Sequence, residues 1–300
     1  MTWLFISLTS YFILAFVLLV DKFLLTSSFS SPKAYAFYAS FFRVLAILLI
    51  PFVGFQIPSF PQILIAFLAG GFFVLGFFLF LKGLQSFDPS RIAPAVGGAV
   101  PIFIFLLVFV FSGGKEVLKL NDLAAFLLLI AGGFLITVRK SKFVSLGSLR
   151  ISLPAAFFFA VSFVLSKYVY LTQTFWNGFI LISFSGFLAS LFFLFSKEVR
   201  DNLFRAGIPK KAFGVFFLNQ AFGALAGTLQ NFAIFLAPLA LVAIINALQG
   251  AQYVFLLILV IFLSRKFPWI FKEEISKSVI LQKAAAILLI GLGLVLLTLK

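Results

Sequence analysis

Long apolar segments separated by short polar ones make up almost the whole 300-residue chain. The apolar runs cover residues 3–25, 34–54, 62–81, 92–112, 122–138, 151–171, 175–196, 212–236, 240–263 and 282–299. Ser, Pro, Gly and charged residues gather in the breaks, as in "SSFSSPK", "QIPSFPQ" and "SGGKEVLKLND". About 20 apolar residues cross a bilayer as a helix, and backbone groups in lipid must be hydrogen-bonded within their own segment. The pattern therefore predicts ten membrane-spanning helices.

The two halves of the chain resemble each other. The segment "AFVLLVDKFLL" (15–25) aligns with "AVSFVLSKYVY" (160–170), which places Lys22 opposite Lys167 late in the first span of each half. Five crossings per half are an odd number, so the second half begins on the opposite side of the membrane. The two repeats must then be inverted relative to each other, an arrangement typical of secondary transporters with a substrate site near the membrane midplane.

The expected fold class is an all-α membrane protein with ten transmembrane helices in two inverted five-helix repeats. The first repeat covers residues 1–140, a basic linker covers 141–150, and the second repeat covers 151–300. The N-terminal sequence "MTWLFISLTS" has no basic region before its apolar run, so we expect a retained first span rather than a cleaved signal peptide.

Composition removes several kinds of chemistry. The chain is 63% hydrophobic and 10% charged, with a mean hydropathy of +1.23. It contains no Cys and no His, so the usual ligands of zinc and haem are missing, as is the base of a catalytic triad. We expect no catalytic residue, no metal and no cofactor, and we expect that the protein is not an enzyme.

The net charge of +15 lies mostly in loops between apolar runs, so it indicates membrane orientation rather than nucleic-acid binding. Loops that join an odd-numbered span to the following even-numbered span carry most of the Lys and Arg. The positive-inside rule then places these loops in the cytoplasm and both termini outside. The expected location is the cell membrane, as a multi-pass protein.

Arg43, in "YASFFRVLAILLI", is the arginine that the pattern places deepest in a span. It lies about nine residues from either end of its run, which is roughly 14 Å deep at a rise of 1.5 Å per residue. A charge there should face the bundle interior or water. Arg43 either binds a carboxylate or phosphate of a substrate or forms an ion pair with Asp21, and one residue could do both in different states. Asp21 is the acidic residue expected inside a span, so it is the candidate for proton coupling; facilitated diffusion is the alternative.

The eighth and ninth spans are rich in amides, namely Asn219, Gln220, Gln230, Asn231, Asn246, Gln249 and Gln252. Asn246, Gln249 and Tyr253 share one helical face by their spacing, and Gln220 and Asn231 share another. These amides either line a polar cavity that binds substrate or join helices by hydrogen bonds.

Other candidates lie in spans one, two, four and six. Tyr38 is a candidate wall of the substrate site, and Tyr35 is either a second wall or an anchor at the membrane interface. Lys22 and Lys167 either extend to the interface or make gating contacts. A fourth span interrupted at proline is either a hinge or a packing face; its residues are Pro94, Gly97, Gly98 and Pro101.

Four features together resemble the EamA-type ten-helix transporters of the drug/metabolite transporter superfamily, over nearly the whole chain. They are the paired lysines Lys22 and Lys167, "FFRVLAILLI", "AVGGAVPIFIFLLVFVFSGGKE" and "LAAFLLLIAGGFLITV". The second half departs from the pattern, with Leu188 where the arginine would stand and Gly250 in place of proline. The resemblance implies termini inside the cell, opposite to the charge distribution.

The sequence predicts a secondary transporter that moves small polar metabolites across the cell membrane by alternating access, and the resemblance favours export of amino acids or related metabolites. A flippase for lipid-linked substrates and a non-transporting membrane scaffold are the alternatives. The expected partners are a small-molecule substrate and the lipid bilayer. The sequence predicts neither the substrate, the direction of transport nor the oligomeric state.

Overall fold

The computed structural model describes residues 1–29, 31–87, 89–137, 146–206, 210–266 and 277–299, and every regular element in these ranges is helical. The first half contains α1 (Thr2–Ser27), α2 (Pro32–Phe41), η1 (Phe42–Leu49), α3 (Ile50–Val53), α4 (Phe60–Ser86), α5 (Pro89–Phe111) and α6 (Leu120–Thr137). The second half contains α7 (Leu146–Thr172), α8 (Phe175–Leu191), η2 (Phe192–Phe195), α9 (Lys197–Asp201), η3 (Asn202–Ala206), α10 (Lys210–Leu236), η4 (Leu239–Leu241), α11 (Val242–Ala247), α12 (Gln249–Lys266) and α13 (Lys277–Thr298).

The helices have the length and composition of a membrane bundle. Within the described residues, eight continuous helical stretches are long and apolar enough to cross a membrane, and α5 and α6 add two shorter apolar stretches. Three of the eight stretches combine several elements, as α2, η1 and α3 do over Pro32–Val53. The chain is therefore an all-helical integral membrane protein. The count of ten spans stays a prediction, because α5 and α6 contribute only the shorter stretches.

Local sequence signals account for several helix boundaries. Ser31 accepts a hydrogen bond from the Ala34 backbone N–H at the start of α2, and Thr174 caps α8 in the same way. Ser59 begins α4 with a capping box. At the other ends, Gly54 closes α3 with φ of 64°, a backbone conformation that favours glycine.

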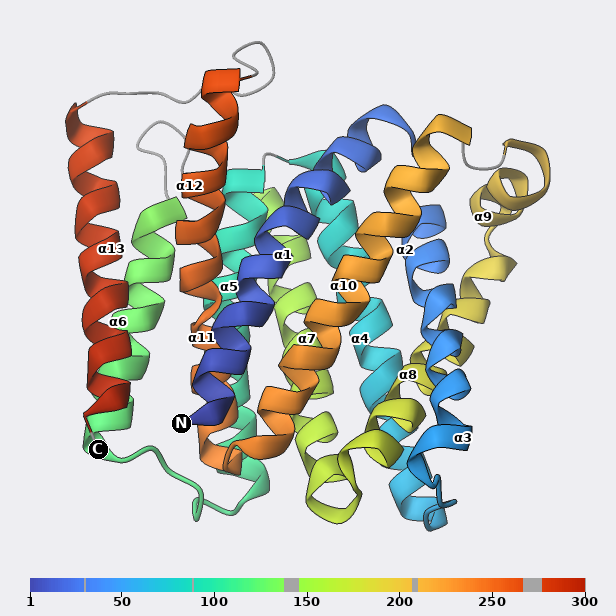
Figure 1. Cartoon of the computed structure of the whole chain (residues 1–300), viewed down its shortest axis with the longest axis horizontal. Coiled ribbons are helices and arrows are strands. Elements are labelled where there is room, and N and C mark those ends of the chain that lie inside the picture. The colour runs from blue at the N-terminus through green and yellow to red at the C-terminus, as the bar shows by residue number, and fades with distance from the viewer. Residues whose placement is uncertain (30, 88, 138–145, 207–209, 267–276, 300) are drawn as a thin grey trace.

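Long helix pairs hold the bundle together. α4 packs along α7, α1 along α10, α5 along α7, and α6 along α13. Figure 1 shows α6 and α13 at one edge of the bundle and α2, α8 and α9 at the other. Glycine permits close helix approach at these contacts: a Cβ on Gly70 of α4 would stand 2.5 Å from the Gly186 backbone nitrogen of α8.

Two expected helix interruptions differ from the structure. α5 continues through Pro101, because a proline within a membrane helix is tolerated when neighbouring helices support the turn. In the second half the interruption lies at Leu248, between α11 and α12, rather than at Gly250. Residues 138–145, which include the start of the expected linker 141–150, lie outside the described residues, and α7 begins at Leu146 within that linker.

Candidate functional site

Arg43 lies where the second span departs from regular α-helix. The 3₁₀ helix η1 carries Arg43 and ends shortly before Pro51. Proline has no backbone N–H and its ring disfavours the preceding α-helical turn, and 3₁₀ runs longer than about four residues are uncommon. None of the eight residues of η1 is fully buried. The segment that carries Arg43 is therefore a tightly wound 3₁₀ helix that the bundle does not fully enclose.

The Arg43 guanidinium rests between α4 and α8. Its Cζ lies 4.5 Å from the centroid of the Phe73 ring, the geometry of a cation–π contact. Its Nε is buried and has no hydrogen-bond partner. A Cβ on Gly186 would stand 2.7 Å from this Nε, so only glycine leaves room for the side chain at that point. Phe73 and Gly186 thus fix the direction in which the guanidinium points.

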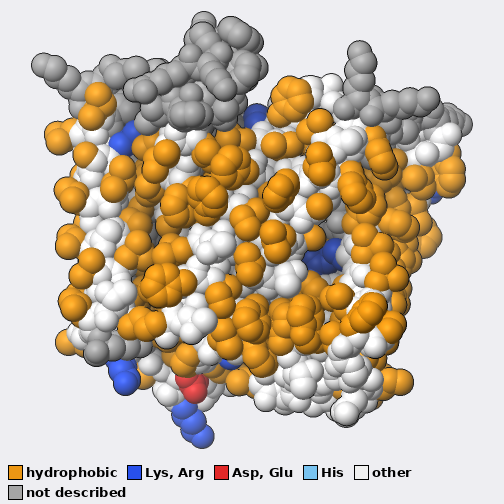
Figure 2. Space-filling view, in the orientation of Figure 1, with side chains coloured by type: hydrophobic (Ala, Val, Ile, Leu, Met, Phe, Trp, Pro, Cys, Tyr) orange, Lys and Arg blue, Asp and Glu red, His pale blue; other side chains and the backbone are white. Residues whose placement is uncertain are grey.

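A hollow lies on the face of the molecule between α10 and α2. Figure 2 shows basic side-chain atoms at the bottom of this hollow, at mid-height and surrounded by apolar side chains. Gly227, in the middle of α10, borders open space, because a Cβ placed on it would meet no atom within 4 Å. α10 packs along α1 and makes only slight contact with α8. Along this line α10 therefore stands largely clear of α8.

Aromatic contacts join α10 to its neighbours at both of its ends. Phe217, near the start of α10, has its ring 5.7 Å from that of Phe42. Phe232, near the other end, has its ring 4.9 Å from that of Phe175 on α8. The hollow lies between these two contact zones.

Tyr38 and the tyrosine–amide pair Tyr170–Asn231 belong to these zones. The Tyr38 ring lies 6.3 Å from Phe216 at the upper zone, and its side chain is half-buried. The Tyr170 hydroxyl donates to Asn231 Oδ1 at 2.9 Å, and the Asn231 amide donates to the Gly227 carbonyl at 2.9 Å. Asn231, predicted from the amide pattern, therefore joins α7 to α10.

A second polar centre surrounds Asp21. The Tyr35 hydroxyl and the Asn219 amide both donate to Asp21 Oδ1, the latter at 2.6 Å. Gln220 donates to the Tyr35 hydroxyl at 3.4 Å. Asp21 and Tyr35 belong to the first half, and the two amides to the second. Tyr35 is fully buried, so the interfacial position considered for it is wrong.

Arg43 and Asp21 do not form the ion pair that the sequence left open. Asp21 accepts its hydrogen bonds from neutral donors, and Arg43 contacts Phe73 and Gly186. The α2 and η1 segments carry Tyr35 and Arg43 about eight residues apart, so a helix of that length separates the two centres by roughly 12 Å along its axis.

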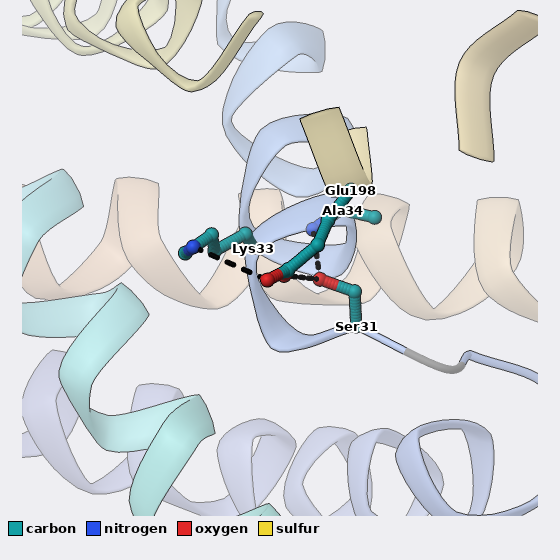
Figure 3. A network of polar contacts seen from close by, with 4 residues as sticks. All are labelled: Ser31, Lys33, Ala34 and Glu198. Carbon is teal, nitrogen blue, oxygen red and sulfur yellow. Dashed lines mark hydrogen bonds and ion pairs between the residues drawn. The ribbon is translucent and has the colours of Figure 1, made fainter. Parts of the chain in front are cut away.

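The ion pair that the described residues do contain lies at the upper end of the bundle. Glu198 of α9 accepts from Ser31 at 2.9 Å and pairs with Lys33 at 3.4 Å, while Ser31 also caps α2 (Figure 3). A carboxylate at a helix N-terminus is favourable. This network ties α9 to the start of the second span.

Lys22 and Lys167 make equivalent contacts in the two halves. Lys22 Nζ donates to the Leu84 carbonyl at 3.2 Å, near the end of α4. Lys167 Nζ donates to the Phe235 carbonyl at 3.0 Å, near the end of α10. Each cation meets unpaired carbonyls at a helix C-terminus, where positive charge is favourable. Lys167 is only 3% exposed, which excludes extension to the interface in this conformation.

The ninth-span amides lie apart from the hollow. Asn246 is buried and donates to the Val242 carbonyl of its own helix. The Tyr253 hydroxyl donates to the Ala93 carbonyl of α5 at 2.6 Å. A Cβ on Gly97 would stand 2.9 Å from Gln249 Oε1, so Gln249 packs against α5. The break at Leu248 also divides the helical face that the spacing predicts for these three side chains.

The fourth-span residues lie where α5 meets α6 and α12. Gly97, Gly98 and Pro101 line a small cavity together with Gly133, Gly250 and Tyr253. A Cβ on Gly98 would meet no atom within 4 Å, so this position tolerates change. The side chain of Pro94 lies outside the described residues. The predicted hinge set thus lies at a contact between α5, α6 and α12, away from Arg43.

Sequence reasoning missed three residues of these two centres: Phe73, Tyr170 and Gly186. Asn219, named among the amides, joins two helices by its hydrogen bond to Asp21. A polar residue within an apolar span was a usable signal for Tyr170. Nothing in the sequence marks Phe73 among 47 Phe, or Gly186 among 21 Gly. Their roles follow only from the packing of α4 and α8 on η1.

No model of a known protein family matches the chain, and no curated protein matches it. Among solved structures, 22 chains match. One of them, described as "Crystal structure of protein", has a TM-score of 0.70 over 99% of this chain and 98% of that chain, at 16% sequence identity. At that identity the likeness shows the fold alone. The same arrangement of helices therefore occurs, from end to end, in another protein.

Proposed function

We propose that the chain is a secondary transporter of small polar metabolites, of the EamA type within the drug/metabolite transporter superfamily. The observation that carries this proposal is Arg43, which lies near the middle of the second span on η1, between Phe73 of the first half and Gly186 of the second, and forms no ion pair among the described residues. A charge at that depth is costly and usually functional. Transport of amino acids or related metabolites out of the cell is the favoured form.

Equivalent contacts in the two halves support inverted repeats. The lysine late in the first span of each half donates to the end of the third span of the same half. The second span of each half changes from α-helix to 3₁₀ helix, at Phe42 and at Phe192. The third span of each half packs along the first span of the other, as α4 with α7 and α10 with α1. Ten spans in two inverted groups of five account for all three features.

Asp21 is the proposed site of proton coupling. Its carboxyl group is buried, and its hydrogen-bond donors among the described residues, Tyr35 and Asn219, are neutral. Burial of a carboxyl group without a cation nearby favours its protonated form, because an unpaired charge is costly in an apolar interior. Asp21 also bridges both halves, so a change in its protonation acts on a contact that alternating access must break.

The cell membrane and an orientation with both termini outside complete the proposal. α1 begins and α13 ends on the same side of the bundle (Figure 1). The loops that carry most of the Lys and Arg in the sequence are expected on the opposite side, which the positive-inside rule would place in the cytoplasm. Accessibility of a C-terminal tag to an impermeant reagent tests this orientation against the opposite one that the family resemblance implies.

Reconstitution into liposomes tests the transporter proposal directly. We expect saturable counterflow of at least one compound from a panel of amino acids, organic acids, sugars and nucleosides. Lys33→Gln serves as a control, because Lys33 lies in an exposed ion pair far from the hollow. Absence of saturable flux for the whole panel, with correctly inserted protein, would support a membrane scaffold instead.

A lipid-linked substrate is the second candidate, because the hollow opens on a lateral face of the bundle (Figure 2). A flippase would move a fluorescent lipid between leaflets of the same liposomes. Lipid movement without flux of soluble metabolites would decide for this alternative.

A further inference from the structure

Among the described residues, no acidic side chain compensates the positive charge of Arg43. The described acidic residues are Asp21, Glu116, Asp122, Glu198 and Asp201. None of them forms an ion pair with Arg43, since the pair found among the described residues joins Lys33 and Glu198. Asp21 is engaged by Tyr35 and Asn219. An uncompensated guanidinium at mid-membrane depth costs free energy in the empty site, and an anionic ligand would recover that cost.

The position of the guanidinium determines which of its atoms a ligand can reach. Phe73 covers one face of the planar group, and Gly186 lies against Nε. Nε is fully buried and has no hydrogen-bond partner among the described residues. Neither terminal nitrogen is both fully buried and without a partner. The edge formed by these two nitrogens is therefore the part left for a ligand, and this fork matches the two oxygens of a carboxylate or phosphate.

The neutral groups near Arg43 favour a ligand with net negative charge over a zwitterion. Asn231 Oδ1 already accepts from Tyr170, and the amide of Asn231 is used by the Gly227 carbonyl. No described carboxylate forms an ion pair with Arg43, and Asp21 is engaged by Asn219, so these contacts leave no acidic partner for an ammonium group. The aromatic contact zones at either end of α10 suit an apolar remainder.

We propose that the Arg43 site binds the oxyanion group of its substrate, a carboxylate or phosphate on a molecule with net negative charge. The proposal rests on the transport function argued above, and it narrows the small polar metabolites to organic anions, in place of the zwitterionic amino acids that the resemblance favours. The oxyanion can belong to a water-soluble acid or to the headgroup of an anionic lipid, since the hollow opens laterally.

Ligand-dependent thermal stability of the purified protein in neutral detergent tests the proposal without requiring transport. A ligand that binds only the folded state raises the melting temperature with its concentration. One arm adds benzoate, inorganic phosphate or zwitterionic leucine; the other adds phosphatidylglycerol or phosphatidylcholine. We expect stabilisation by the anion in one arm and none by leucine or phosphatidylcholine. The arm that responds identifies the source of the oxyanion.

Variants connect the effect to Arg43. Arg43→Gln should remove anion stabilisation, and Arg43→Lys should weaken apparent affinity by roughly tenfold, because an ammonium lacks the two-pronged fork. Leu45→Ala, two residues away and 49% exposed, is the matched control and should behave as the wild type. If Arg43→Gln does not fold, Gly186→Ala displaces the guanidinium while keeping its charge and should weaken the same effect.

Failure of this inference is separable from failure of the transport proposal. Stabilisation of Arg43→Gln equal to that of the wild type, stabilisation by leucine alone, or no stabilisation in either arm would each overturn the oxyanion site. Liposome flux of neutral or zwitterionic compounds would still establish a transporter in those cases. Anion stabilisation without any flux would instead retain the site and reject transport.

Discussion

Gly186 and Arg43 are in such close contact that a methyl group on the glycine would stand 2.7 Å from the arginine Nε. Gly186→Ala should therefore move the guanidinium away from α8 and reduce substrate flux at least as much as Arg43→Lys does. The change also bears on stability, because the Gly186 backbone lies in the close contact between α4 and α8. Flux measured together with the melting temperature separates the two effects: flux should fall by more than the loss of folded protein explains.

Gly227→Trp should block the hollow without disturbing the fold. Gly227 borders open space, so an indole there occupies the hollow rather than a packed interior. We expect normal insertion and melting temperature with loss of flux. Gly227→Ala is the control: it fills little space, and alanine favours a helix over glycine by about 1 kcal/mol. Undiminished flux in the tryptophan variant would place the transport path elsewhere.

Asp21→Asn should uncouple transport from protons. The asparagine carbonyl can still accept from Tyr35 and Asn219, so the contact between the halves survives, but the group no longer titrates. Counterflow should persist, while a pH gradient should no longer drive accumulation. Internal pH dyes and radiolabelled substrate measure the two processes in one preparation. Accumulation that still follows the gradient would assign coupling to another group or to none.

Removal of either helix-capping lysine should lower stability. Lys167→Met leaves the Phe235 carbonyl without its charged donor, and Lys22→Met does the same at Leu84. A hydrogen bond to a charged group contributes about 1.5–3 kcal/mol, so both variants should melt earlier in detergent. A higher melting temperature for Lys167→Met would mean that burying the ammonium costs more than its contacts return.

Glu198→Gln should have little effect. The Glu198 side chain is 57% exposed, and exposed ion pairs contribute less than about 1 kcal/mol. Its amide oxygen can still accept from Ser31. We expect flux and melting temperature close to those of the wild type at physiological salt. A large loss would show that the link between α9 and α2 participates in the transport cycle.

The positions of the helices follow closely from the sequence, because length and apolarity of a segment suffice to define a membrane helix. The correspondence of Lys22 with Lys167 was also predictable, since both residues occupy the same position in the repeated pattern. The atoms that the two lysines contact could not be predicted. The acceptors depend on where α4 and α10 end in space, which no local pattern specifies.

The candidate site was only partly predictable. Arg43 is conspicuous because a charge in an apolar run needs a reason, and Asn231 because amides are rare in such runs. The expected single substrate site divides in the structure: Gln249 and Tyr253 contact α5, Asn246 bonds within its own helix, and Arg43 lies between α4 and α8. Spacing along one helix shows which side chains share a face, but it does not show which neighbouring helix that face meets.

Equivalent helix contacts in the two halves of the chain are packed unequally. α4 lies tightly against α8, with Gly70 against Gly186, whereas its counterpart α10 stands away from η1 with Gly227 uncovered. Inverted repeats predict that a second conformation exchanges these two arrangements. Gly227 would then lie on a surface that is open in this conformation and that η1 covers when α4 and α8 separate. In that exchange η1 would carry Arg43 with it, so that the guanidinium faces a different part of the bundle.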